Sequence, residues 1–167
     1  MKYILCIFFS LFTLLCFPQN TESRLSLKFK QADSVLLISH GDTKGYGFVD
    51  SLGNSLPQPQ LLVGNKPNYK IIKERKLING QELSKLIEIL TRSSKSNITT
   101  VITNGCFTPH HTIFLFKNGK TSYIDLCFMC RGFETSKDLK NLSEFESSKW
   151  AELEFFFRKA GFKYKLD

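Results

Sequence analysis

The sequence lacks an apolar run long enough to cross a membrane. Its N-terminal apolar stretch, residues 4–17, has 14 residues behind a single lysine, whereas a helix that crosses about 30 Å of hydrocarbon needs about 20. A short apolar run after one positive charge is typical of a secretory signal. We therefore expect residues 1–19 to be a signal peptide and the protein to be exported, to the periplasm, the cell envelope or the exterior.

Few cysteines remain once the expected signal is set aside. The chain has 5, of which Cys6 and Cys16 lie in the expected signal, so only Cys106, Cys127 and Cys130 remain. Three cysteines cannot all pair within one chain. Cys16 also offers an alternative to a plain signal peptide: a lipoprotein signal ending near Cys16, whose lipid would attach the protein to the outer face of a membrane.

Acidic residues are outnumbered, with 15 Asp and Glu against 23 Lys and Arg and a formal net charge of +8. The basic residues are scattered along apolar faces and no nucleic-acid recognition motif is present, so we expect solvated surfaces and no nucleic-acid partner. Repeats and low-complexity segments are missing as well. The length of 167 residues is enough for one domain, which we expect over residues 32–167 and as a monomer. Residues 20–31 are polar and are expected to be a tether.

The patterning of this domain predicts an α+β fold, a mostly antiparallel sheet with two helices packed on one face. The expected elements are strands over 34–39 and 69–78, a helix over 80–92, a hairpin of strands 112–116 and 121–126, and a last helix with Trp150, Leu153, Phe157 and Ala160 on one side.

Helix ends are also marked in the sequence. Asn79 with Glu82, and Ser143 with Glu146, have the spacing of capping boxes at the start of the two helices. Gly161 is expected to end the last helix, after which the chain folds back.

The hairpin register predicts that the three cysteines outside the signal lie close together. A type I′ turn at Asn118-Gly119 places Thr112 opposite Asp125 and His110 opposite Cys127. Directly opposed side chains share a face, so Cys106, His110, Cys127 and Cys130 are expected to gather at the open end of the hairpin. His111 points to the other face unless Pro109 shifts the register, so the histidine that joins the cluster is left open.

Three interpretations of this cluster compete. Three thiolates and one imidazole could form a structural zinc site. Alternatively, Cys106 forms a disulfide with Cys127 or Cys130, as an oxidising compartment favours. The third interpretation is redox chemistry at Cys127 and Cys130, but such pairs usually begin a helix, and this pair ends a strand.

Neighbouring polar residues add second-rank candidates. Asp125 would orient a cluster histidine from behind, or it is a strand-edge acid exposed to water. His40 and Asp42, beside Gly41, would line a pocket in a loop rich in Gly and Asp, but a solvent-exposed turn is the expected outcome.

The segment around the cysteines resembles a group of small exported bacterial proteins. The shared motif is Cys-x-x-Pro-x-His followed by Cys-Phe-x-Cys, which falls on Cys106, Pro109, His111, Cys127 and Cys130. The resemblance extends over residues 32–164. It implies export and a single domain, assigns no activity to the group, and matches His111 rather than His110.

The sequence thus predicts an exported cell-envelope protein with a binding or structural role and no enzymatic activity, whose fold is stapled by the Cys/His cluster. The alternative is a metal-dependent or thiol-based enzyme centred on the same residues, with zinc as the expected cofactor in the metal-dependent case.

Overall fold

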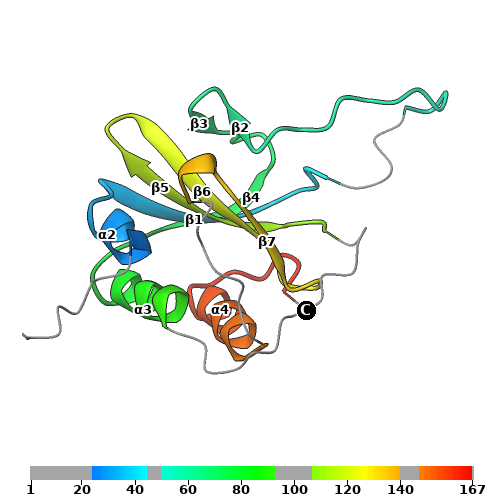
Figure 1. Ribbon diagram of the computed structural model, residues 1–167. Helices are drawn as coiled ribbons and strands as arrows, with labels where there is room; N and C mark the ends of the chain where they lie inside the picture. The colour runs from blue at the N-terminus through cyan, green and yellow to red at the C-terminus, as the bar shows by residue number, and fades with distance from the viewer. Residues whose placement is uncertain (1–23, 45–49, 93–106, 140–146, 167) are drawn as a thin grey trace, which may run out of the picture.

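An antiparallel sheet of five strands organises the domain (Figure 1). The computed structural model describes residues 24–44, 50–92, 107–139 and 147–166. The strands are β1 (Ser34–His40), β4 (Ile72–Ile78), β5 (His111–Lys117), β6 (Lys120–Cys127) and β7 (Gly132–Thr135). Their order across the sheet is β4-β1-β5-β6-β7. A second, two-stranded sheet pairs β2 (Leu62–Val63) with β3 (Lys66–Pro67).

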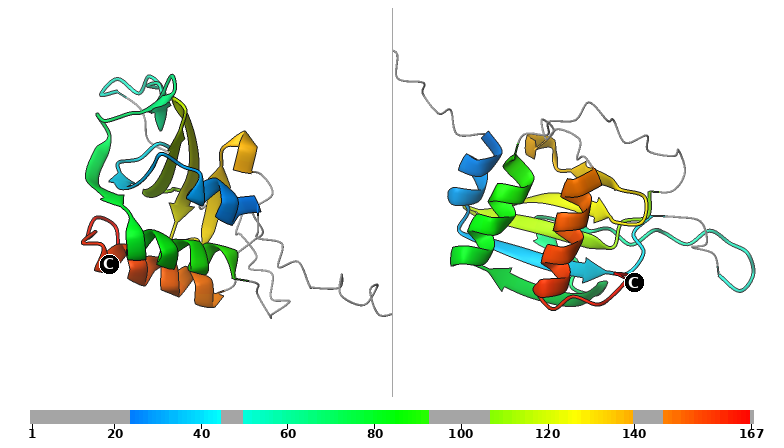
Figure 2. Two further views of the ribbon diagram at one scale, coloured as in Figure 1. Left: turned by 90° about the vertical axis from the view of Figure 1, so that its left-hand side faces the viewer. Right: turned by 90° about the horizontal axis from the view of Figure 1, so that it is seen from below.

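The three described α-helices and the small sheet lie on opposite sides of the five-stranded sheet (Figure 1). The described helices are α2 (Arg24–Lys30), α3 (Gly80–Thr91), α4 (Ser147–Lys159) and a short 3-10 helix, η2 (Lys137–Leu139). Figure 2 shows α2, α3 and α4 side by side below the sheet, with α3 in contact with both of the others.

The main core fills the space between these helices and one face of the sheet. Successive strand residues point to opposite faces, so alternate residues reach the core. The sheet contributes Val35, Leu37, Ile113, Leu115, Ile124 and Leu126, and the helices contribute Phe29, Leu86, Ile89, Leu90, Trp150, Leu153 and Phe157. Burial of this apolar surface is the main force that holds the helices on the sheet.

The opposite face of the sheet is buried in its middle as well. Ile38 and Phe114 are fully buried there, although they lie outside the core cluster on the helix side. The Thr121 hydroxyl on this face donates to the carbonyl of Asn65, in the turn between β2 and β3. The small sheet is therefore tied to this face, and the middle of the face is out of solvent.

The α+β class is confirmed, and the tether prediction is wrong. The expected strands and two helices are present as β1, β4, β5, β6, α3 and α4. Residues 20–31 were predicted to be a polar tether, but Arg24–Lys30 forms α2, whose Phe29 is fully buried in the core. A helix of seven residues has too few apolar positions for its period to stand out in the sequence. The structure therefore has three described α-helices where two were expected.

The hairpin register is confirmed. Thr112 pairs with Asp125 and His111 pairs with Leu126. Asn118 and Gly119 have φ of 50° and 72°, the positive values that a type I′ turn requires at both central residues. Because the turn fixes the register, every side chain of the hairpin falls on the face that the sequence predicted.

The predicted helix caps have different outcomes. Asn79 precedes α3, but its side chain makes no capping hydrogen bond, and Glu82 pairs instead with Lys76 at 2.6 Å. Gly161 ends α4 with φ of 100°, and Phe162 then folds back into the core. The predicted capping box of Ser143 and Glu146 lies outside the described residues.

One edge strand of the sheet is highly charged, and the other is short. The edge strand β4 contains four consecutive charged residues, 73–76, and its solvent-facing positions alternate with half-buried ones. The other edge strand, β7, has 4 residues. Only alternate positions of β4 are therefore available to pack against its neighbours.

Within the described ranges, no helix has the length and apolar character needed to cross a membrane. The expected signal segment, with the lipidation candidate Cys16, falls outside those ranges, so export and lipid attachment stay predictions.

Candidate functional site

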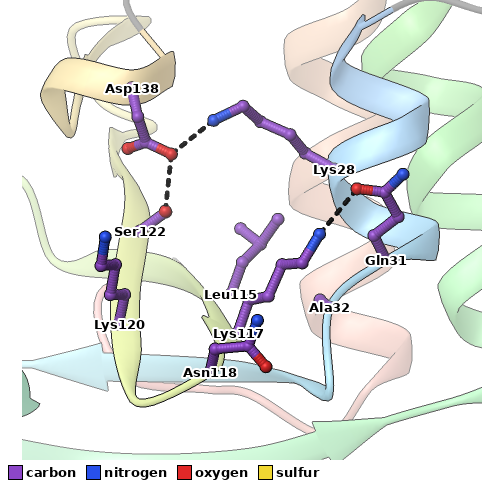
Figure 3. Close-up of a pocket in the computed structure, with 9 residues that line it drawn as sticks. All are labelled: Lys28, Gln31, Ala32, Leu115, Lys117, Asn118, Lys120, Ser122 and Asp138. Atoms are coloured by element: carbon purple, nitrogen blue, oxygen red, sulfur yellow. Dashed lines mark hydrogen bonds and ion pairs between the residues drawn. The ribbon is translucent and has the colours of Figure 1, made fainter.

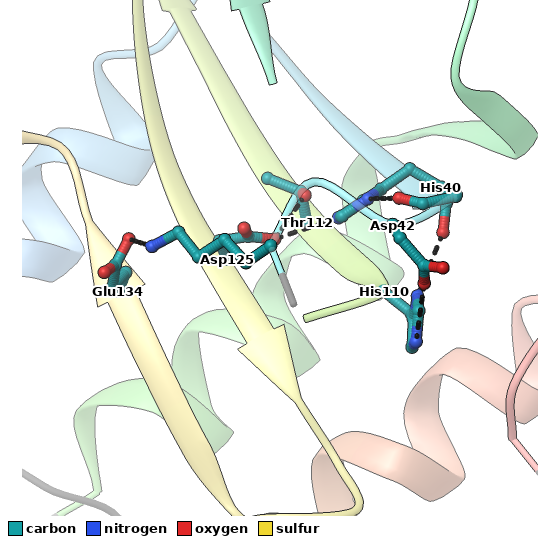
Figure 4. Close-up of polar contacts among 8 residues, drawn as sticks. His40, Asp42, His110, Thr112, Asp125 and Glu134 are labelled. Atoms are coloured by element: carbon teal, nitrogen blue, oxygen red, sulfur yellow. Dashed lines mark hydrogen bonds and ion pairs between the residues drawn. The ribbon is translucent and has the colours of Figure 1, made fainter. Parts of the chain in front are cut away.

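Three polar side chains meet on the sheet face opposite the helices, where β1, β5 and β6 lie side by side. His40 ends β1, Thr112 lies on β5, and Asp125 is its direct partner on β6. Their exposed fractions are 0%, 0% and 2%. We call these three residues the His40 cluster, which Figure 4 shows with its surroundings.

The hydrogen bonds of the His40 cluster use both nitrogens of the imidazole. Nε2 lies 3.0 Å from Asp125 Oδ1, and Nδ1 lies 2.7 Å from the carbonyl oxygen of Gly41. A carbonyl only accepts, so Nδ1 bears a proton, and one further proton lies between Nε2 and Oδ1 whichever group holds it. Neither nitrogen is then open to a metal ion or a substrate.

Asp125 has a second partner at the same oxygen. The Thr112 hydroxyl donates to the same Oδ1 at 2.8 Å. On the far side of Asp125, its strand partner Glu134 pairs with Lys44 across the edge of the site. The buried carboxylate thus has a hydrogen-bonded partner on two strands, which is the condition under which a buried charge is tolerated.

The outer part of the site is a second histidine and a second acid. His110 Nδ1 donates to the carbonyl of His40 at 3.3 Å, and His110 Nε2 lies 3.6 Å from Asp42 Oδ1, which is too far for a hydrogen bond. Burial lowers the pKa of His110, although the backbone contact with His40 and the Asp42 carboxylate oppose that effect. The side chains of His110 and Asp42 are 17% and 60% exposed.

His111 points the other way, as its place on the strand predicted. It lies 1% exposed in the helix-side core, with ring centroids 5.0 Å from Phe128 and 5.3 Å from Phe157. In the described part of the chain its Nε2 has no hydrogen-bond partner. Burial lowers the pKa of His111 to about 3, with His40 and His110 acting in the same direction, so the ring is neutral at pH 7.

His111 therefore makes a prediction about acid stability. The unfolded chain takes up a proton near pH 6.5 that the folded chain refuses until about pH 3, so the unfolded state binds more protons between these values. Stability then falls as the pH drops through this window, by up to about 1.4 kcal/mol per pH unit from this residue. Urea titrations at pH 7, 6, 5 and 4 should show a smaller decline for His111→Leu than for the wild type. Equal declines would contradict this assignment.

The cysteines take a different pairing from the two that the disulfide interpretation expected. Cys127 ends β6 and is joined to Cys130 in the following turn, with their Cα atoms 5.6 Å apart. The backbone N–H of Cys130 also donates to Cys127 Sγ at 3.4 Å. Cys127 and Cys130 are therefore disulfide-bonded to each other. Cys106 lies outside the described residues.

The predicted Cys/His cluster is only partly assembled in the structure. His110 shares the sheet face of Cys127 but contacts His40 and Asp42, and His111 lies on the opposite face. Across the described ranges, no group of three or more His, Cys, Asp or Glu side chains is placed to hold a metal ion. Zinc bound with Cys106 stays a prediction that these ranges do not test.

The expectation for His40 was wrong, and of the two expectations for Asp125 one fits the structure in part. His40 was expected in a solvent-exposed turn, but it ends a central strand and is fully buried. Asp125 was expected either to orient a histidine or to face water, and it does contact a histidine, although this is His40. One signal was available: the confirmed register places Thr112 beside Asp125 on a face whose neighbours Phe114 and Tyr123 are aromatic, and buried polar pairs there need a further partner.

Comparison of the chain with protein-family models, with curated proteins and with solved structures finds no match.

Proposed function

We propose that this chain is an exported α+β domain of the cell envelope with a binding or structural role and no enzymatic activity. The observation that supports this most is the closure of the His40 cluster. A general base or metal ligand needs a free lone pair within reach of its substrate, and both nitrogens of His40 are occupied out of solvent.

The cysteines support the same proposal. A reactive thiol usually lies at a helix N-terminus, where its pKa is lowered, and is accessible. Cys127 instead ends a strand and is 2% exposed. We infer that the bond to Cys130 staples the turn between β6 and β7, and that export to an oxidising compartment keeps it formed.

The sharpest test is a metal analysis with a thiol count on mature protein that was secreted and purified without chelator or reductant. We expect no bound metal, one titratable thiol after denaturation, and three thiols after reduction. The single thiol should be Cys106, which mass spectrometry of alkylated peptides would locate. One zinc per chain with three thiols in unreduced protein would overturn the staple in favour of a metal site.

Removing the staple should destabilise the domain modestly. The two cysteines are separated by 3 positions in the chain, and closing so short a loop removes little entropy from the unfolded state, about 2 kcal/mol. We expect the double variant Cys127→Ser/Cys130→Ser to lose about that amount in urea unfolding. Cys106→Ser is the control and should leave the free energy of unfolding unchanged; an equal loss in that control would mean that Cys106 takes part in the staple.

A further inference from the structure

A pocket lies on the helix side of the sheet, at the hairpin end that α3 and α4 leave uncovered. It has a volume of about 360 Å³ and opens between α2, the β5-β6 hairpin and η2 (Figure 3). This size lies in the range of small-molecule sites. Its lining residues are Lys28, Gln31, Ala32, Leu115, Lys117, Asn118, Lys120, Ser122 and Asp138.

The lysines of the pocket are only partly neutralised. Lys28 pairs with Asp138 at 2.5 Å, whereas Lys117 donates to the neutral Gln31 side chain at 2.7 Å. The amine of Lys120 makes no hydrogen bond or ion pair with the residues that Figure 3 draws around the pocket. Three ammonium groups and one carboxylate leave the lining with a formal charge of +2.

Asp138 does not block the pocket for an anion. Its carboxylate accepts from Lys28, from the Ser122 hydroxyl at 2.8 Å and from the Ser136 hydroxyl at 2.7 Å. Burial alone would raise the pKa of Asp138, but these hydrogen bonds outweigh it and lower the pKa to about 2. The carboxylate is held against the η2 side of the pocket, where it fixes Lys28.

The rim of the pocket opposite Asp138 is polar, whereas its base is apolar. At the rim, Asp33 accepts from the backbone N–H of Asn118 at 2.8 Å, outside the lining itself. At the base, Leu115 is only 4% exposed, and Ala32 is the other apolar residue of the described lining. A ligand therefore meets ammonium groups around the opening and a small apolar surface beneath them.

We propose that this pocket binds a small phosphate monoester whose alcohol part is apolar. A phosphate monoester is close to a dianion at pH 7, which matches the charge of the lining. Lysine binds phosphate as a point charge, whereas planar carboxylates are usually recognised by the fork of an arginine, and the residues that the structure describes around the pocket include no arginine. Leu115 and Ala32 provide the contact for the carbon part of the ester.

This inference goes beyond the proposed function and does not depend on it. The pocket lies at the hairpin turn, whereas the His40 cluster and the disulfide lie at the other end of β5 and β6. Loss of ligand binding would leave the thiol count and the effect of removing the staple unchanged, so the two proposals fail separately.

The test is isothermal titration of the mature protein with phenyl phosphate, with benzoate as an apolar monoanion for comparison. We expect phenyl phosphate to bind at low ionic strength and more weakly at high salt, and benzoate to bind at least tenfold more weakly. Loss of one charge-assisted hydrogen bond should cost about tenfold in affinity, so Lys120→Met should weaken binding by about tenfold and Lys117→Met/Lys120→Met further.

The matched control is Lys70→Met. Lys70 is an exposed lysine that precedes β4, near the His40 end of the sheet and outside the pocket lining. The Lys70→Met substitution removes the same charge as Lys120→Met but outside the pocket. Binding of phenyl phosphate should therefore weaken by less than twofold. Equal losses in Lys70→Met and Lys120→Met, or equal binding of benzoate and phenyl phosphate, would overturn the proposal. Circular dichroism and melting temperature, unchanged in all variants, would show that each loss is local.

Discussion

Replacement of Asp125 by alanine is expected to lower the free energy of unfolding by about 3–5 kcal/mol, because it leaves two buried polar groups without their shared partner. The change leaves His40 Nε2 without its hydrogen-bond partner at 3.0 Å and the Thr112 hydroxyl without its acceptor at 2.8 Å. Both groups are fully buried, so water cannot replace the lost contacts. Urea unfolding at pH 7 measures the effect.

The control for Asp125→Ala is an exposed pair on α4. Glu154 and Arg158 form an i,i+4 contact at 2.7 Å with side chains 36% and 43% exposed, and such pairs contribute less than about 1 kcal/mol. Glu154→Ala should therefore change stability little. If Asp125→Ala also cost less than about 1 kcal/mol, the His40 cluster would not stabilise the domain.

A second large loss, again about 3–5 kcal/mol, is expected for Phe157→Ala. Phe157 is fully buried at the centre of the aromatic core. Its ring centroid lies 5.3 Å from His111, 5.6 Å from Phe128 and 5.2 Å from Phe162. Truncation removes these edge-to-face contacts and leaves a cavity that neighbours on different elements cannot close by a small shift.

Phe155 provides the matched control, because it lies on the same helix two residues away and is 59% exposed. Phe155→Ala should cost no more than about 1 kcal/mol by the same denaturant titration. A loss for Phe157→Ala as small as that for Phe155→Ala would mean that α4 is not packed on the sheet as described.

The parts of the fold that the sequence predicted are those set by local rules. The turn at Asn118-Gly119 fixes the hairpin register by backbone geometry alone, and every pair from His111 with Leu126 to Lys117 with Lys120 follows from it. Likewise the period of Leu83, Leu86, Ile87 and Leu90 defines α3 without reference to other elements.

The parts that it did not predict depend on contacts between distant segments. α2 is a seven-residue helix held by the burial of Phe29 against the core, and isolated helices of that length are not stable. His40 is buried because β1 lies between β4 and β5, a strand order that no local pattern encodes. The His40 cluster could therefore not be predicted without knowing which strands flank β1.

The charged edge of the sheet bears on behaviour at high concentration. Three of the four charged residues at 73–76 of β4 are cations, so a second copy that added to this strand would bring two strands of net positive charge together. An exposed strand edge is a template for aggregation, and charge on the strand or a short strand opposes it. The other edge strand, β7, has only four residues and offers little backbone for another strand to pair with. Edge-to-edge pairing of native domains is therefore disfavoured at both borders of this sheet, by charge at β4 and by strand length at β7.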